Sequence, residues 1–250
     1  MIRLVNVSKS FKSQQVLRDV NLVIPTGQTS VILGRSGGGK SVLLKHIMGL
    51  IRPDSGEIWI DDDEINRLNQ RDLYRVRKRF GMLFQEGALF DSMSVGENVA
   101  FPIREHRKLK APEIEKLVSE KLALVGLEGI EDKLPSELSG GMRKRVALAR
   151  AMALDPDIML FDEPTTGLDP IMTASIDHLI IETQKRFQMT CVVISHDIQS
   201  VFRIAHNVFM LYEGKIIEGG TPEAFRQSTN KIIQDFLLGQ IPEHSDLVQN

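Results

Sequence analysis

The sequence predicts an α/β protein with a mixed, mainly parallel sheet, an N-terminal antiparallel β subdomain and an inserted helical lobe. TSVIL is a short β-rich run, and DIMLF and TCVVIS are nearly continuously apolar, which is typical of parallel strands buried on both faces. A glycine-rich loop, GRSGGGKS, directly follows the first of these runs. From about residue 86 to residue 154 the apolar spacing becomes helical, which indicates the lobe.

Composition limits the function classes. The chain has 250 residues, of which 42% are hydrophobic, enough for one domain with a substantial core. The net charge of −2 gives no reason to expect a nucleic-acid partner. The single cysteine, Cys191, excludes a disulfide framework and is expected to be buried. No window approaches the roughly 18 consecutive apolar residues of a membrane span, so work at a membrane would need another protein as anchor.

The individual elements follow from local patterns. Segments 2–11 and 16–27 look like a pair of β segments, and GEIWIDDDEI alternates in polarity like a further strand. Segment 111–127 is predicted to be a helix. Segment 169–187 is predicted to be a helix with Asp169 as its N-cap and Pro170 at its first position. NVFMLYEGKIIEGG looks like a hairpin that turns at Glu213 and Gly214.

The glycine-rich loop predicts a triphosphate site. GRSGGGKS matches G-x-x-x-x-G-K-[ST] and lies between a predicted strand and a predicted helix. Glycines let consecutive backbone N–H groups turn toward phosphate oxygens, and the helix N-terminus adds a positive dipole end. We expect Lys40 to reach the β- and γ-phosphates and the Ser41 hydroxyl to bind Mg²⁺. The binding set is Gly34, Ser36, Gly37, Gly38, Gly39, Lys40, Ser41 and Val42.

Candidate catalytic groups follow two of the buried strands. IMLFDEP ends in adjacent carboxylates, of which Asp162 is suited to bind Mg²⁺ and Glu163 to activate a water molecule. His196 follows TCVVIS, and carboxyl ends of parallel strands meet at a ligand crevice. A contact from His196 to the γ-phosphate is therefore predicted, although a lone histidine is more often structural.

A second anion site is predicted at LSGGM. The Ser139 side chain and the N–H groups of Gly140 and Gly141 lie at a helix start. The basic run 143–145 that follows is expected to be a solvated helix face. Because one small nucleotide hardly needs two cradles from one chain, the second cradle is expected to serve a nucleotide bound to another copy.

These motifs together closely resemble the ATP-binding subunits of ABC transporters, over about residues 1–225. The order is GRSGGGKS as Walker A, Gln85 as Q-loop, LSGGM as signature, IMLFDEP as Walker B, GLD as D-loop and His196 as switch histidine. The resemblance implies a P-loop NTPase fold, ATP and Mg²⁺ as cofactors, and ATP hydrolysis by a homodimer. We therefore expect an ATP-binding domain at 1–239 and a polar tail at 240–250.

The resemblance also implies roles for further residues. Phe11 would stack on adenine, and Gln85 would contact Mg²⁺ or the attacking water. Ser139 and Gly141 would hold the γ-phosphate of the other subunit's ATP, and Asp169 would cross the dimer interface. Met142 departs from the glutamine usual in the family, which puts the ribose contact in doubt.

Met142, Gly87 and the surrounding segments resemble one branch, the ATPases of Mla/Mce-type lipid transport systems. That branch implies an integral membrane permease, an MCE-domain substrate-binding protein and a place at the cytoplasmic face of the bacterial inner membrane. An importer ATPase for amino acids or metals, a soluble ABC ATPase without a permease and a non-hydrolysing nucleotide sensor stay open as alternatives.

Two apolar segments allow either a core or a partner contact. Leu89, Phe90 and Met93 could belong to the core of the lobe or to a groove for a cytoplasmic helix of the permease. The amphipathic segment KIIQDFLLG is expected to pack on its own domain.

Overall fold

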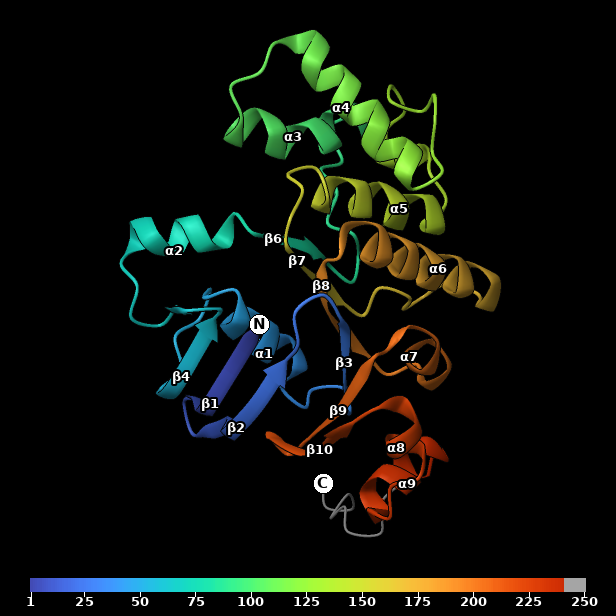
Figure 1. The fold of residues 1–250 in the computed structure, drawn as a ribbon. Coiled ribbons are helices and arrows are strands. Elements are labelled where there is room, and N and C mark those ends of the chain that lie inside the picture. The colour runs from blue at the N-terminus through green and yellow to red at the C-terminus, as the bar shows by residue number, and fades with distance from the viewer. Residues whose placement is uncertain (241–250) are drawn as a thin grey trace.

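The computed structural model describes residues 1–240, and its centre is a six-stranded sheet in the order β10-β9-β3-β8-β7-β6 (Figure 1). All neighbours in this sheet are parallel except the β9–β10 hairpin. The strands are β3 (Thr29–Leu33), β6 (Phe80–Leu83), β7 (Ile158–Asp162), β8 (Thr190–Ser195), β9 (Asn207–Tyr212) and β10 (Lys215–Gly220). The predicted mixed parallel sheet is confirmed.

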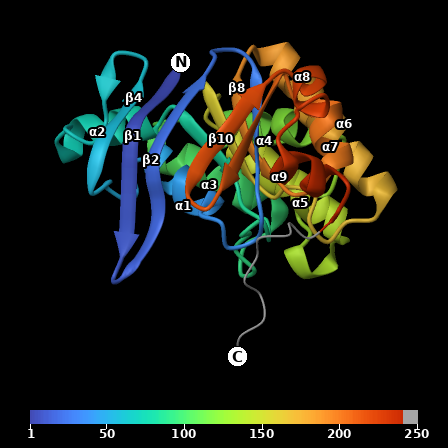
Figure 2. The same ribbon diagram turned by 90° about the horizontal axis from the view of Figure 1, so that it is seen from below.

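A second, antiparallel sheet has the order β2-β1-β4-β5 and lies to one side of the first (Figures 1 and 2). Its strands are β1 (Ile2–Phe11), β2 (Gln14–Ile24), β4 (Ser55–Ile60) and β5 (Asp63–Glu64). This sheet confirms the predicted N-terminal antiparallel subdomain.

The helices begin where the sequence provides caps. Ser94 and Glu97 form a reciprocal capping box at α3, and Asp169 accepts the N–H groups of Ile171 and Met172 at the start of α6. The helices are α1 (Lys40–Ile47), α2 (Gln70–Arg77), α3 (Val95–His106), α4 (Ala111–Leu124), α5 (Gly140–Ala151), α6 (Pro170–Phe187), α7 (Ile198–Ile204), α8 (Pro222–Arg226) and α9 (Lys231–Leu237), with a 3₁₀ turn at Pro135–Glu137. In Figure 1, α3, α4 and α5 lie together at the top, within the range predicted for the lobe.

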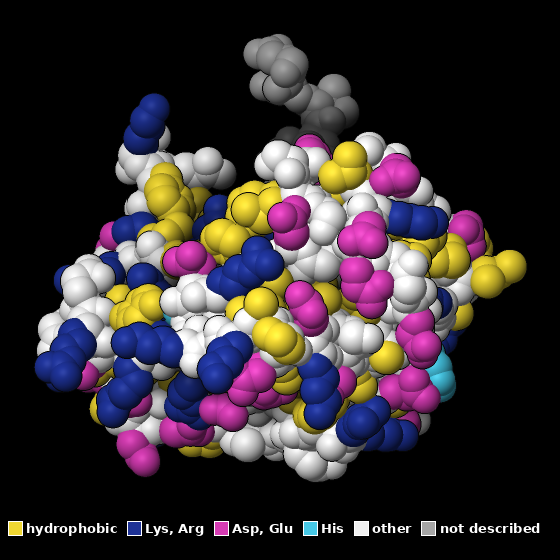
Figure 3. Space-filling view, turned by 90° about the horizontal axis from the view of Figure 1, so that it is seen from above, with side chains coloured by type: hydrophobic (Ala, Val, Ile, Leu, Met, Phe, Trp, Pro, Cys, Tyr) yellow, Lys and Arg dark blue, Asp and Glu magenta, His cyan; other side chains and the backbone are white. Residues whose placement is uncertain are grey.

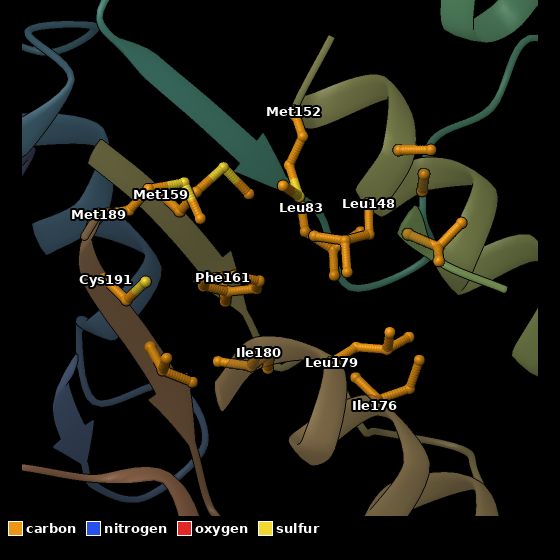
Figure 4. Close-up of a cluster of buried hydrophobic side chains, with 14 of the residues drawn as sticks. Leu83, Leu148, Met152, Met159, Phe161, Ile176, Leu179, Ile180, Met189 and Cys191 are labelled. Atoms are coloured by element: carbon orange, nitrogen blue, oxygen red, sulfur yellow. The ribbon is translucent and has the colours of Figure 1, made fainter. Parts of the chain in front are cut away.

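The parallel sheet is buried on both faces, which explains why its strands do not alternate in polarity. Side chains of Val31, Met159 and Phe161 belong to one apolar cluster, which includes residues of α5 and α6 (Figure 4). Their neighbours Ile32 and Leu160 belong to a second cluster, shared with α1 and the antiparallel sheet. Each strand therefore supplies both cores with successive residues.

Two other predictions concern single segments. Cys191 is buried, and this burial raises the pKa of its thiol to about 12. In α9, Ile233 is buried and Phe236 packs against the main core, so the prediction that this segment packs on its own domain is confirmed.

Residues 241–250 of the predicted tail lie outside the described residues. Across residues 1–240, no helix combines the length and apolar character needed to cross a bilayer.

Phe161→Ala should lower the free energy of unfolding by about 3–5 kcal/mol, because Phe161 is fully buried at the centre of the first cluster. Phe187→Ala is the matched control, since Phe187 is 40% exposed and its truncation should cost less than about 1 kcal/mol. Urea unfolding followed by circular dichroism measures both. Equal losses for the two variants would contradict the assigned core.

Candidate nucleotide-binding site

The parallel topology gathers the predicted motifs at one edge of the sheet. Strand β3 ends at the glycine-rich loop, β7 ends at Asp162, and β8 ends directly before His196. Strand β6 ends two residues before Gln85. Because these strands are parallel neighbours, their carboxyl ends meet at the same edge, as expected for a ligand crevice.

The glycine-rich loop has the shape of an anion cradle. Gly37 and Gly39 have φ values of 75° and 94°, which side-chain-bearing residues rarely adopt. A Cβ on Gly34 would lie 2.4 Å from the carbonyl oxygen of Leu211. The loop leads into the N-terminus of α1, where backbone N–H groups and the helix dipole favour a phosphate.

Lys40 is held against this loop. Its Nζ donates hydrogen bonds of 2.9 Å to the carbonyl oxygens of both Gly34 and Arg35. Burial lowers the pKa of Lys40, while the carboxylates of Glu163 and Asp162 oppose that shift. The lysine is thus a nearly buried cation that points along the loop where phosphates would lie.

The oxygens of Ser41 and Asp162 fit a hard divalent cation. Ser41 Oγ donates to Asp162 Oδ1 over 3.1 Å, so a hydroxyl and a carboxylate from two different elements converge. Burial raises the pKa of Asp162, and the charge of Glu163 adds to this shift. A half-buried carboxylate with an oxygen ligand beside it is the donor set that Mg²⁺ prefers, so the residues present fit the ion.

Glu163 occupies the centre of the site in a strained backbone conformation. Its φ is 49°, and its N–H donates to the carbonyl oxygen of Ile194 in β8 over 3.0 Å. One carboxylate oxygen lies 3.8 Å from Lys40 Nζ, and the other lies 3.3 Å from His196 Nδ1. Thr166 also donates to this second oxygen over 3.1 Å.

A cavity of about 600 Å³ opens beside these groups. Its lining includes Gly34, Ser36, Glu163 and His196, which follow three strands, together with α7 and α9 residues and Gln240; Lys40 and the Ser41–Asp162 pair lie outside that lining. This volume is within the usual range for small-ligand sites. The lining shows that the predicted loop, the Glu163 carboxylate and His196 face one cavity.

The helix start predicted at LSGGM is present, and it lies outside the cavity described above. Ser139 is the N-cap of α5, and its Oγ accepts the N–H of Met142. A Cβ on Gly141 would lie 1.9 Å from Met172 Cε, so a larger residue there would have to displace the end of that flexible side chain. Neither Ser139 nor Gly140 nor Gly141 lines the cavity beside Glu163 and His196.

The expectation of a solvated basic face at 143–145 is wrong for two of its three residues. Lys144 is buried, and its ammonium donates to the backbone oxygen of Gln85. Arg145 donates to Val125 O over 3.0 Å and to Ser175 Oγ over 2.6 Å. These two cations turn inward because backbone carbonyls and a hydroxyl provide acceptors that helical spacing alone does not reveal. Only Arg143 is exposed.

The remaining predicted residues are placed as follows. Phe11 ends β1 with 43% of its surface exposed, and the ammonium of Lys9 lies 5.6 Å from the centre of its ring. Gln85 is exposed after β6, Val42 is half-buried in α1, and Asp169 is exposed while it caps α6. No distance places Phe11 or Gln85 against the phosphate loop, so their roles stay predictions.

Sequence reasoning missed Thr166 and Lys144. Thr166 lies three residues after Glu163, and a hydroxyl at that spacing is a weak signal for a turn that closes on the carboxylate. Lys144 gave no signal, because its acceptor is 59 residues away in sequence.

A strained carboxylate between a loop lysine and a histidine, with an oxygen donor set beside them, defines a P-loop ATPase. The family model described as ABC transporter matches residues 17–166. The chain therefore belongs to the ABC transporter family, as an ATP-binding subunit.

Known proteins resemble the chain over most of its length. It is 47% identical over 234 residues to the "probable ribonucleotide transport ATP-binding protein mkl" of Mycobacterium tuberculosis, covering 94% of this chain and 65% of that protein. It is 45% identical over 240 residues to the "intermembrane phospholipid transport system ATP-binding protein MlaF" of Haemophilus influenzae, covering 96% and 91%. The chain thus spans just under two thirds of the mycobacterial relative.

A solved structure shows the same fold in a dimer. The dimeric, post-hydrolysis structure of the ATP-binding cassette MJ0796, bound to ADP and Pi, aligns with a TM-score of 0.82 at 33% identity. The alignment covers 89% of this chain and 99% of that one.

Asp162→Asn should raise the melting temperature of the nucleotide-free protein. The pKa of Asp162 is raised, so its ionised form costs folded-state stability at any pH above that pKa, and a neutral amide removes the cost. A gain of about 1 kcal/mol corresponds to roughly 2–4 °C for a chain of this size.

Melting curves at pH 7.5 with and without MgATP measure this effect. The variant should also lose the extra stabilisation that MgATP gives the wild type. A lower melting temperature without nucleotide would contradict the electrostatic account.

Proposed function

We propose that this protein is the ATP-hydrolysing subunit of a bacterial ABC transporter that moves phospholipids or other hydrophobic molecules between membranes. The observation that carries the ATPase part is the position of Glu163, held between Lys40 and His196 beside the Ser41–Asp162 oxygens. This arrangement supplies a base, a phosphate-binding cation and a metal ligand set at one sheet edge.

Each residue at the edge has a distinct task in this proposal. Backbone N–H groups of the loop from Gly34 to Gly39 and the α1 N-terminus bind the triphosphate, and Lys40 neutralises its terminal phosphates. Glu163 accepts a proton from the attacking water, and His196 orients Glu163 and contacts the γ-phosphate. Mg²⁺, held by Ser41 and Asp162 with Gln85, would neutralise charge on the β- and γ-phosphates.

We also propose that the working unit is a homodimer. The chain holds a second helix N-terminus suited to an anion at Ser139–Gly141, and it does not line the cavity beside Glu163 and His196. The dimeric MJ0796 cassette, which shares the fold, supports a second copy as its user. Asp169 would then lie at the interface, and Phe11 would stack on the adenine.

A permease is the proposed membrane partner. An aromatic groove of about 700 Å³ is lined by Tyr74, Phe84, Phe90 and Phe101, which are each at least 36% exposed. Exposed apolar patches of this kind mark sites for partner helices. In the view from above, Lys and Arg side chains gather beside hydrophobic patches on the side where α2 lies (Figure 3).

The groove is directly connected to the Gln85 loop. Arg150 of α5 donates to the carbonyl oxygens of Ala88 and Gly87, over 2.8 and 2.9 Å, and its guanidinium lies 5.7 Å from the ring centre of Phe90. The sequence left open whether Leu89 and Phe90 belong to the core or to a partner groove. Phe90 lines the groove, and Leu89 packs against the protein's own core. A helix seated in the groove would therefore contact the loop that carries Gln85.

The cargo is the least constrained part of the proposal. The names of MlaF and mkl point to phospholipid and ribonucleotide transport, respectively, at similar identities. We favour lipid cargo and an MCE-domain partner because LSGGMRKR and the segment after Gln85 resemble Mla/Mce-type ATPases. The subunit would then act at the cytoplasmic face of the inner membrane.

Glu163→Gln should reduce ATP hydrolysis by about 10²–10⁴-fold, because the amide cannot accept the proton of the attacking water. ATP binding should persist, so an ATP-bound dimer should accumulate in size-exclusion chromatography. Lys40→Ala is the control, since it should lose binding as well as hydrolysis and give no such dimer. Hydrolysis by Glu163→Gln at the wild-type rate would refute Glu163 as the base.

Phe90→Asp and Phe101→Asp should each weaken permease binding by about 2 kcal/mol, or roughly 30-fold in Kd, since both rings lie in the groove. The ATPase rate of the isolated subunit should stay within about twofold of wild type. Phe187→Asp, at an exposed position outside the groove, is the matched control. Affinity capture from detergent-solubilised membranes measures the bound integral membrane protein.

The captured transporter also tests the cargo. Extraction and mass spectrometry of its bound small molecules should find phospholipid. Recovery of ribonucleotide in place of lipid would favour the alternative named for the mycobacterial relative, and an ATPase recovered without any membrane protein would contradict the transport proposal.

A further inference from the structure

A buried carboxylate lies between α6 and α7, away from the residues assigned to the nucleotide. Asp177 in α6 is fully buried. Ser200 Oγ donates to its Oδ1 over 2.6 Å, and Arg203 Nη1 donates to its Oδ2. Both partners belong to α7, and Figures 1 and 2 place the two helices side by side.

This cluster is a costly way to join two helices. An ionised carboxylate loses several kcal/mol of hydration on burial, and the ion pair regains that energy only with good geometry and further hydrogen bonds. Two apolar side chains at the same positions would join the helices at least as tightly. The cluster therefore provides a fixed relative position of α6 and α7 more than it provides stability.

The helix to which Asp177 is bonded begins two residues after His196. His196 is followed by Asp197, whose carboxylate caps α7 by accepting the N–H groups of Gln199 and Ser200. Ser200 therefore bonds Asp197 through its backbone and Asp177 through its hydroxyl. Two hydrogen bonds thus link Asp177 of α6 to Asp197, the residue next to His196. Asp197 also donates its N–H to Ser195 Oγ at the end of β8.

The N-terminal end of α6, which Asp169 caps, lies against the second anion site. Asp169 caps α6 eight residues before Asp177, which corresponds to about 12 Å along a helix. Met172 lies against Gly141, and Arg145 of α5 donates to Ser175. One 18-residue helix thus touches the Ser139–Gly141 receptor, the Asp169 turn and the base of the His196 loop.

We propose that Asp177, with Ser200 and Arg203, is a positioning residue that fixes His196 relative to α6 and so couples hydrolysis at one nucleotide site to the Asp169 turn at the dimer interface. The inference rests on the proposed function, because it assigns Asp177 to the same ATPase. Asp177 does not touch nucleotide; it acts through α7.

The first test separates binding from turnover. Asp177→Asn should lower kcat by roughly tenfold or more, since displacing a reacting group by about 1 Å can cost 100-fold. Affinity for a fluorescent ATP analogue should change less than about twofold, because the phosphate loop and α1 are not bonded to α7. Arg203→Lys, which keeps the charge, should retain most of the rate that Arg203→Met loses.

Asp155→Asn is the matched control for a general loss of stability. Asp155 pairs with Arg107 and Lys121 far from α7, and asparagine tolerates its φ of 55°. Its kcat should be unchanged while that of Asp177→Asn falls, with each variant assayed at the same interval below its own melting temperature. If both variants show the same kcat under those conditions, Asp177 is only structural and the inference fails.

A double-mutant cycle tests the coupling to the interface. Asp169→Asn keeps an oxygen for the α6 cap and removes the charge. If α6 transmits between Asp169 and His196, the kcat losses of Asp169→Asn and Asp177→Asn will not multiply in the double variant. Multiplicative losses would overturn the coupling. A wild-type protein without ATPase activity would instead refute the proposed function itself.

Discussion

Burial of the parallel sheet on both faces is the constraint on which the site depends. With β3, β7 and β8 packed between two apolar clusters, the strands cannot shift along one another without exposing a whole face. Their carboxyl ends are therefore fixed in register, which brings Lys40, Glu163 and His196 within hydrogen-bonding or ion-pair distance. The apolar core thus determines the geometry of the charged edge.

The charges at this edge are balanced in a way that favours a nucleotide with its metal ion. Asp162 and Glu163 are adjacent carboxylates, and burial together with their mutual repulsion raises the pKa of Asp162. Lys40 is the nearest cation, and its own pKa is lowered by burial. A divalent cation would relieve the repulsion between the carboxylates, while the loop N–H groups and Lys40 accept the phosphates. The nucleotide-free protein is therefore less stable than it would be without these charges, and binding of the nucleotide with its metal ion offsets that loss.

The parts of the fold and site that could be predicted are those with local causes. The loop GRSGGGKS needs positive φ values at Gly37 and Gly39, and the α6 cap needs the oxygen of Asp169. Both signals lie within a few residues of the structure they produce. The roles assigned to Phe11 and Gln85 came from resemblance, and no measured distance yet tests them.

The parts that sequence reasoning missed depend on distant partners. Lys144 follows the exposed Arg143, and only the fold brings the oxygen of Gln85 to its ammonium. Asp177 follows the buried Ile176 in α6, so the helical spacing of apolar residues places it near the buried side of the helix. Its partner Arg203 lies 26 residues away on another helix, and helical spacing contains no information about such a pair.

The two predicted anion receptors of one chain lie apart, and α5 and α6 are the helices that connect them. Ser139–Gly141 does not line the cavity beside Glu163, so in the proposed homodimer each chain would offer one half of two different sites. Hydrogen bonds from α5 reach the Gln85 loop through Lys144 and Arg150, and α6 is bonded to both α5 and α7. The remaining contacts between these helices are apolar packing, which has little directional preference. The hydrogen bonds therefore fix the positions of the helices relative to one another and to the Gln85 loop. In the proposed transporter, these largely part-buried hydrogen bonds would supply directional links between groove, receptor and the His196 loop, in addition to the strand register that the apolar core fixes.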